Sequence, residues 1–133
     1  MTREEIYEDI RDTLGLVPTF FTRVPDATLE HDWLNFKSLQ LQDTAISIKV
    51  KELIGLAAAA AIQCPYCVFY HTEVAKFFGA TEEEVSEAIR MGMQTAGWST
   101  FIAGTGQNLD EFRQELRQAL EYIRARQEKK KAA

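Results

Sequence analysis

The stretch Cys64-Pro65-Tyr66-Cys67-Val68-Phe69-Tyr70-His71 organises the interpretation of the whole chain. Its two cysteines are the only ones in the sequence, and His71, one of two histidines, follows the second cysteine by four positions. Positions i, i+3 and i+7 share one face of an α-helix. The spacing therefore predicts that Cys64, Cys67 and His71 point from one helix in the same direction.

Pro65 indicates where that helix begins. Proline has no N–H and a fixed φ, so it suits the first residue of a helix better than its interior. Cys64 is then expected at the N-cap, and Cys67 within the first turn. Free backbone N–H groups and the positive end of the helix dipole stabilise a thiolate there, and CxxC spacing lowers cysteine pKa values in the same way.

An acidic residue precedes the cysteines by twelve positions. Glu52 lies in a segment expected to be helical from the Ser47 cap to about Ile62, with Gly55 and the alanines 57–61 on its path. Only Gln63 separates this helix from the next, so the two should form an antiparallel hairpin. Twelve helical residues span about 18 Å, and the hairpin therefore brings Glu52 nearer to His71 than to Cys64.

Local signals predict helices along almost the whole chain, so the expected fold class is all-α. Thr2 and Glu5 form a capping box for a helix that stops at Gly15, and Asp26 is expected to cap a helix to about Leu41. A further helix is expected to end at Gly79. Thr81 and Glu84 form a second capping box, before a helix that runs through Met93. Gly97, Gly104 and Gly106 are expected to interrupt the chain around a short helical segment over 98–103, and a last amphipathic helix is expected over about 108–128.

Size and composition describe one globular domain over residues 1–133. The sequence has 46% hydrophobic and 26% charged residues, which is typical of such domains. A net charge of −5 argues against nucleic acid as a partner, because phosphate binding depends on clustered basic residues.

The start of the chain and its apolar runs predict a cytoplasmic protein without a membrane span. Met1 is followed by charged Arg3, Glu4 and Glu5 rather than by an apolar run, so no signal peptide is expected. The run from Leu53 to Ile62 is much shorter than the roughly 18 residues of a span. In the cytoplasm, a lone CxxC is more often catalytic or metal-binding than a structural disulfide.

The motifs together resemble a known family. Lys51-Glu52-Leu53-Ile54, then Cys64-x-x-Cys67-x-x-x-His71, then the run from Gly79 to Glu84 is similar to the carboxymuconolactone decarboxylase superfamily, and more narrowly to its AhpD-like alkylhydroperoxidase core. The likeness covers about residues 14–106. It implies an all-α helical bundle with the CxxC motif at a helix N-terminus, which assembles into dimers, trimers or hexamers.

The resemblance also implies an activity, which is thiol-dependent reduction of a hydroperoxide or a disulfide. Cys67 would attack the peroxide and Cys64 would resolve the sulfenic acid as a disulfide, with Glu52 and His71 as a proton relay. No flavin, haem or nucleotide motif is present, so no cofactor is expected. Electrons would come from an external dithiol such as a thioredoxin-like or lipoyl protein. The chain departs from well-studied members at Tyr66, where they carry a histidine; Tyr66 is a possible hydrogen-bond donor.

Two other interpretations remain open. Cys64, Cys67 and His71 supply three soft or borderline ligands, and zinc or iron would need a fourth from Glu52, His31 or water. A lactone decarboxylase-like lyase of the same fold is the second alternative, although the decarboxylases that name the superfamily lack the cysteine pair. His31 is otherwise expected to be an exposed surface residue.

Overall fold

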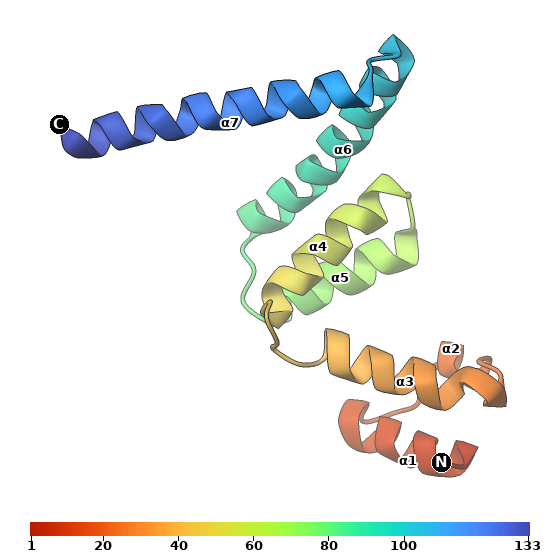
Figure 1. Cartoon of the computed structure of the whole chain (residues 1–133). Helices are drawn as coiled ribbons and strands as arrows, with labels where there is room; N and C mark the ends of the chain where they lie inside the picture. Colours follow the sequence, from red (N-terminus) through yellow and green to blue (C-terminus); the bar gives the residue numbers. More distant parts are fainter. The chain divides into compact units, whose positions relative to one another are not determined.

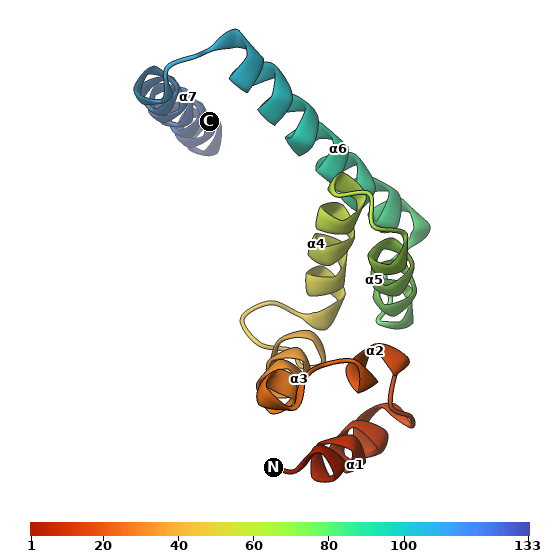
Figure 2. The ribbon, with the colours of Figure 1, turned by 90° about the vertical axis from the view of Figure 1, so that its right-hand side faces the viewer.

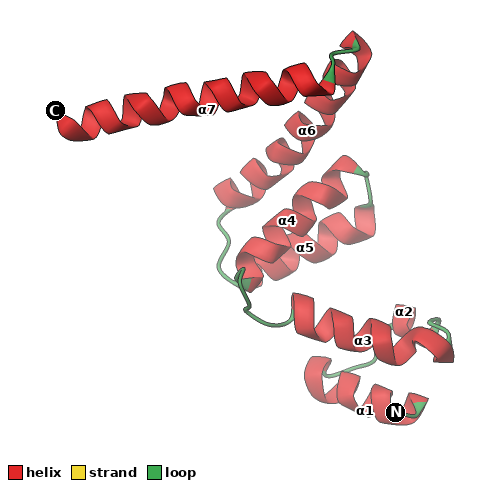
Figure 3. Cartoon of the chain, viewed as in Figure 1, coloured by secondary structure: helices red, strands yellow, loops and turns green.

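The computed structural model describes residues 1–133, and all of its regular elements are helices (Figures 1 and 3). This confirms the all-α prediction. The helices are α1 (Arg3–Leu14), α2 (Thr19–Thr22), α3 (Asp26–Gln40), α4 (Ile48–Ala61), α5 (Pro65–Phe77), α6 (Glu82–Thr105) and α7 (Leu109–Ala132).

Contacts within the chain define two compact units, Met1–Gly92 and Met93–Ala133. Helix α6 contributes residues to both units. The candidate site lies entirely in the first unit, and the second contains the end of α6 and all of α7, which has no buried residue. The single domain expected over 1–133 stays a prediction.

Most helix ends follow the local signals of the sequence. Thr2 accepts a hydrogen bond from the N–H of Glu5 in a complete capping box at the start of α1, and Gly15 ends that helix with φ of 80°. Ser47 caps α4 through the N–H of Val50, and Asn108 caps α7. These ends were predictable because each is satisfied by residues within a few positions of it.

The predicted cap of α3 is wrong. Asp26 is the first residue of the helix rather than its N-cap, and Pro25 at the N-cap makes no side-chain cap. The carboxylate of Asp26 instead forms an ion pair with Arg3, which also donates to the carbonyl of Val24. The side chain of Asp26 therefore binds a residue of α1 and not the backbone N–H groups at the start of α3.

The predicted break at Gly97 is also wrong. Helix α6 continues through Gly97 and Gly104 to Thr105, so the short separate segment over 98–103 does not exist. A glycine inside a helix costs only about 1 kcal/mol relative to alanine. The helix ends at Gly106, whose φ of 68° is the left-handed conformation that glycine adopts readily.

A small core joins α1, α2 and α3. Its members are Ile6, Ile10, Phe21, Leu29 and Trp33, and Trp33 is completely buried. The rings of Phe21 and Trp33 meet edge to face with centroids 5.5 Å apart, which is a favoured aromatic geometry.

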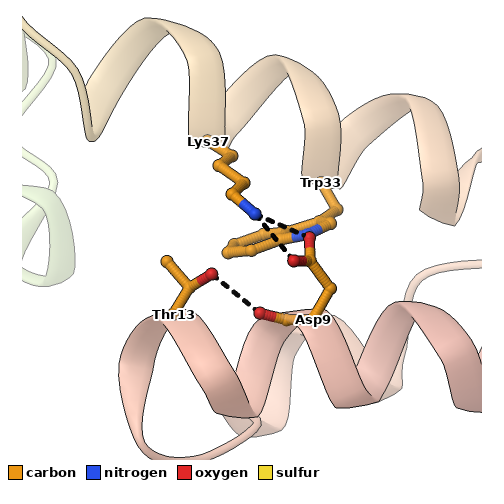
Figure 4. A network of polar contacts seen from close by, with 4 residues as sticks. All are labelled: Asp9, Thr13, Trp33 and Lys37. Carbon is orange, nitrogen blue, oxygen red and sulfur yellow. Dashed lines mark hydrogen bonds and ion pairs between the residues drawn. The ribbon is translucent and has the colours of Figure 1, made fainter.

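The buried indole of Trp33 is held by a carboxylate on α1 (Figure 4). Trp33 Nε1 donates to Asp9 at 2.6 Å, and Lys37 Nζ donates to both oxygens of the same carboxylate at 2.7 and 2.9 Å. Hydrogen bonds from Lys37 first, and Trp33 second, lower the pKa of Asp9. The network satisfies the one polar atom that Trp33 carries into the core and fixes the pairing of α1 with α3.

Helices α4 and α5 form the predicted antiparallel hairpin and lie side by side in both views of the ribbon (Figures 1 and 2). The turn between them is tight, with Gln63 in the left-handed region at φ of 57° and the N–H of Cys64 bonded to the carbonyl of Ala59. The first part of α6 packs closely on α4, because a Cβ atom on Gly92 would collide with the carbonyl of Ala57. No helix is both long enough and apolar enough to cross a membrane.

Candidate functional site: a dithiol and a buried carboxylate–imidazole pair

The cysteine pair stands at the start of α5. Cys64 is the N-cap with extended backbone, and Pro65 is the first helical residue. The N–H of Cys67 donates to Sγ of Cys64 at 3.3 Å, so a sulfur atom occupies the place that an oxygen usually takes in an N-cap. The sequence produces this local structure because Pro65 has no N–H to donate within a helix and therefore suits its first position. The sulfur of Cys64 then lies within reach of the free N–H of Cys67.

The two sulfurs are in direct contact. Their separation is 2.9 Å, both thiols are free, and both side chains are half-buried. The hydrogen bond from the Cys67 thiol, followed by the backbone N–H of Cys67, lowers the pKa of Cys64. The same contact with Cys64, followed by burial, raises the pKa of Cys67. When the pair loses one proton, the charge is therefore favoured on Cys64, whose sulfur then accepts a hydrogen bond from the Cys67 thiol.

Glu52 and His71 form a second pair across the α4–α5 hairpin. His71 Nδ1 lies 2.6 Å from Glu52 Oε2, and the side chains are 19% and 1% exposed. A carboxylate this buried needs a partner, because an isolated buried charge is strongly disfavoured. The prediction that the hairpin brings Glu52 to His71 agrees with this distance. The carboxylate leaves Nε2 of the imidazole as the atom available for another proton acceptor or donor.

The structure describes these as two separate pairs. No hydrogen bond joins either sulfur to Glu52 or His71. His71 nevertheless follows Cys67 by one helical turn, so the two side chains leave the same face of α5. No group of three His, Cys, Asp or Glu side chains is arranged to hold a metal ion, and His31 is exposed on α3.

Of the tyrosines near the motif, Tyr70 rather than Tyr66 contacts the Glu52–His71 pair. Tyr66 is 86% exposed, and its side chain makes no hydrogen bond. The ring of Tyr70 is half-buried, with its centroid 5.1 Å from that of His71. Burial first, and the charge of Glu52 second, raise the pKa of Tyr70 to about 12. The sequence did not predict this contact of Tyr70, because adjacent residues on a helix do not share a face. The only signal was that Tyr70 directly precedes His71.

A cavity of about 380 Å³ opens onto the carboxylate–imidazole pair. Its walls include apolar Leu39, Ile46 and Ile54, and Glu52 and His71 line it, whereas neither cysteine does. Lys51 Nζ donates to the carbonyls of Leu39 and Gln42 at 2.7 and 2.8 Å, which holds the segment between α3 and α4 against the cavity. A small molecule in this space would contact the carboxylate–imidazole pair directly.

Comparison with known proteins identifies the family. The model of the carboxymuconolactone decarboxylase family matches residues 24–106, which include both pairs. The chain therefore belongs to that family. Among solved structures, it is similar to the alkylhydroperoxidase AhpD core from Rhodospirillum rubrum, with a TM-score of 0.70 and 25% identity over 81% of this chain and 82% of that one. The resemblance drawn from the motifs is confirmed.

Two curated relatives carry no assigned activity. One is uncharacterized protein 4 in the cox locus of Paracoccus denitrificans, 35% identical over 47% of this chain and 57% of its own length. The other is an uncharacterized protein of Cupriavidus necator, 36% identical over 42% of this chain and 50% of its own length. The chain thus spans about half the length of the curated relatives that it matches.

Proposed function

We propose that the protein is a thiol-dependent oxidoreductase that reduces a hydroperoxide, or alternatively a disulfide, at Cys64 and Cys67. The observation that carries the proposal is the 2.9 Å contact between two free sulfurs at a helix N-terminus. Two such thiols can be oxidised to a disulfide with little movement of the backbone, because the contact already brings them to neighbouring positions. Family membership and the likeness to the AhpD core support the same class of chemistry.

The proposed reaction has two steps. A thiolate attacks one peroxide oxygen, the O–O bond breaks, and the products are a sulfenic acid and an alcohol after protonation of the alkoxide. The second thiol then attacks the sulfenic sulfur, which forms the Cys64–Cys67 disulfide and releases water. In sum, two thiols and one hydroperoxide give one disulfide, one alcohol and one water molecule, and the two electrons come from sulfur.

The resemblance assigns the attack to Cys67, whereas the hydrogen bond between the thiols favours the thiolate on Cys64. Both assignments hold if the proton shared by the two sulfurs moves before the attack. Transfer of the proton from Cys67 to Cys64 across 2.9 Å produces the Cys67 thiolate without loss of the pair's single negative charge. Cys67 is also the cysteine one turn from His71, so an alkoxide formed there lies nearer to the proton relay.

In the proposed reaction, Glu52 and His71 transfer protons to and from the reacting groups. Glu52 orients the imidazole through Nδ1, which leaves Nε2 to protonate the departing alkoxide and to recover a proton from solvent or from the resolving thiol. The half-buried ring of Tyr70 limits water on one side of the imidazole. The relay would act by general acid–base catalysis, which contributes roughly 10²- to 10⁴-fold in such reactions.

Turnover requires an external reductant for the disulfide. We propose a dithiol protein of the thioredoxin-like or lipoyl-bearing kind, as the resemblance implies. Thiol–disulfide exchange would proceed through a mixed disulfide with the more accessible sulfur.

A lyase that acts on a lactone acid is the second candidate, and one observation favours it. The cavity beside α4 reaches Glu52 and His71 but neither sulfur, which suits acid–base chemistry without thiols. The two candidates differ in their need for cysteine. A Cys64→Ser, Cys67→Ser double variant would keep lyase activity and would lose all peroxide or disulfide reduction.

The proposal is tested by peroxide consumption in the presence of different dithiol reductants. The assay is run on metal-free protein and on protein incubated with zinc or iron. Consumption that needs both cysteines and is independent of added metal supports the proposal. Consumption that appears only with metal would replace it with the metal-site alternative, in which the cysteines are ligands.

A further inference from the structure

We propose that Gly55 is a positioning residue for the proton relay, because the space left by its missing side chain holds the imidazole of His71 against Glu52. The inference deepens the proposed function and rests on it for its catalytic consequence. Its structural content concerns the place of one ring and is testable without any substrate.

The imidazole of His71 lies directly against the backbone of Gly55. A Cβ atom at Gly55 would lie 2.6 Å from Nδ1 and 2.7 Å from Nε2 of His71, and nearer still to Cε1. Ordinary van der Waals contacts of a Cβ atom begin at about 3.4 Å. The edge of the imidazole that carries both nitrogens therefore lies in the volume that any other residue at position 55 would fill.

The position of the ring beside Gly55 is coupled to its contact with Glu52. Gly55 follows Glu52 by three residues on α4, so both occupy the same face of that helix. A displacement of the imidazole away from position 55 therefore also carries Nδ1 away from Oε2 of Glu52, which is 2.6 Å away. The ring of Tyr70 stands beside His71 and restricts movement along α5.

The glycine also keeps the ring accessible. Gly55 lines the same 380 Å³ cavity as Glu52 and His71. A side chain at position 55 would project between the cavity and the imidazole. A glycine is thus required here by close approach and not by backbone conformation, because position 55 lies inside the regular helix α4.

The test compares three glycine-to-alanine variants of the full chain. Gly55→Ala introduces the methyl group beside His71. Gly97→Ala is the matched control, since it makes the same change inside a helix where nothing lies within 4 Å. Gly92→Ala introduces a clash with the carbonyl of Ala57, away from His71, and thus reports on general loss of packing.

The readout is nitrogen NMR of protein labelled at histidine, in which only the Nδ1 and Nε2 signals of two imidazoles have to be resolved because the chain contains two histidines. His31 is exposed and serves as the internal reference. In the unmodified protein, and in Gly97→Ala and Gly92→Ala, Nδ1 of His71 should carry the shift of a nitrogen hydrogen-bonded to a carboxylate. In Gly55→Ala that shift should move to the value for His31, and peroxide turnover should fall as far as in Glu52→Gln, by roughly 10²- to 10⁴-fold.

A double-mutant cycle protects the test against a variant that folds poorly. If the methyl group conflicts with the imidazole, Gly55→Ala should lower the melting temperature only while His71 is present, and should cost little in a His71→Ala background. Retention of the bonded Nδ1 shift in Gly55→Ala, or an equal loss of melting temperature in both backgrounds, would overturn the inference. If no variant has peroxide turnover, the proposed function fails while the NMR shift still decides the role of Gly55.

Discussion

Nδ1 of His71 lies 2.6 Å from Oε2 of Glu52, although the two residues are 19 positions apart and belong to different helices. The carboxylate is almost completely buried, at 1% exposure. Such a group is costly to bury, and the other buried residues of α4 are apolar Ile48, Leu56 and Ala59. The hydrogen-bonded imidazole of His71 is the partner that offsets this cost. In the proposed mechanism this pair is the acid–base element of the site, and the first prediction concerns it.

Glu52→Gln should fold like the unmodified protein but react slowly. The glutamine keeps the size of the side chain and removes the charge that supports the imidazole as a proton donor and acceptor. We expect the rate of peroxide reduction to fall by roughly 10²- to 10⁴-fold, the usual range for general acid–base catalysis. The measurement is single-turnover kinetics of thiol oxidation. Glu73→Gln, an exposed change on α5, is the control. An unchanged rate in Glu52→Gln, with full activity also in His71→Ala, would show that the dithiol works without the pair.

The second prediction concerns the order in which the thiols react with an alkylating agent. The pKa of Cys64 is lowered and that of Cys67 is raised, so the Cys64 thiolate should form at a lower pH than the Cys67 thiolate. Limited alkylation at neutral pH, followed by peptide mass spectrometry, should place the label on Cys64.

The control for that measurement is Cys67→Ala. Because the thiol of Cys67 is the largest cause of the shift at Cys64, its removal should raise the pKa of Cys64 and move labelling to higher pH. Preferential labelling of Cys67, or labelling of both thiols only above about pH 8.5, would contradict the hydrogen-bond arrangement described for the pair.

The sequence predicted those parts of the structure that are settled within one or two helical turns. The Pro65 position placed Cys64 at the start of α5, and Thr2, Ser47 and Asn108 marked three further helix ends. In each case the signal and the group that it satisfies are neighbours in the chain. Gly97 misled the same reasoning, because the modest local cost of a glycine does not decide whether a 24-residue helix continues.

The remaining features depend on how helices face one another, which local spacing does not specify. The sequence suggested that Glu52 approaches His71, but the role of Gly55 depends on the rotation of α4 about its axis. Asp26 was expected to cap a helix and instead pairs with Arg3 of α1. The place of Tyr66 between the cysteines suggests a hydrogen-bond donor, yet its side chain is exposed to solvent, while Tyr70 lies beside the imidazole.

A third prediction concerns assembly. Helix α7 carries exposed apolar residues at helical spacing, namely Leu109, Phe112, Leu116, Leu120 and Ile123. Apolar surface of this kind is typical of interfaces, so we expect a homo-oligomer in solution. Light scattering at micromolar concentration should give a mass that is a multiple of 15.1 kDa. Leu116→Glu combined with Leu120→Glu should reduce the mass, and Glu115→Gln, a neighbouring polar change, should not. A mass of 15.1 kDa for the unmodified protein would refute this prediction.

The central claim is that Cys64 and Cys67 act together as a two-electron reductant, and the most direct test is the stoichiometry of a single turnover. Fully reduced protein is mixed with an equimolar amount of an organic hydroperoxide, and thiols, alcohol and the Cys64–Cys67 peptide are quantified together. The account predicts that two thiols disappear for each alcohol formed, that the peptide carries an intramolecular disulfide, and that a dithiol restores the starting state. Cys64→Ser should stop instead at a sulfenic acid on Cys67. Intact hydroperoxide alongside two titratable thiols, at neutral pH and after hours of incubation, would contradict the claim.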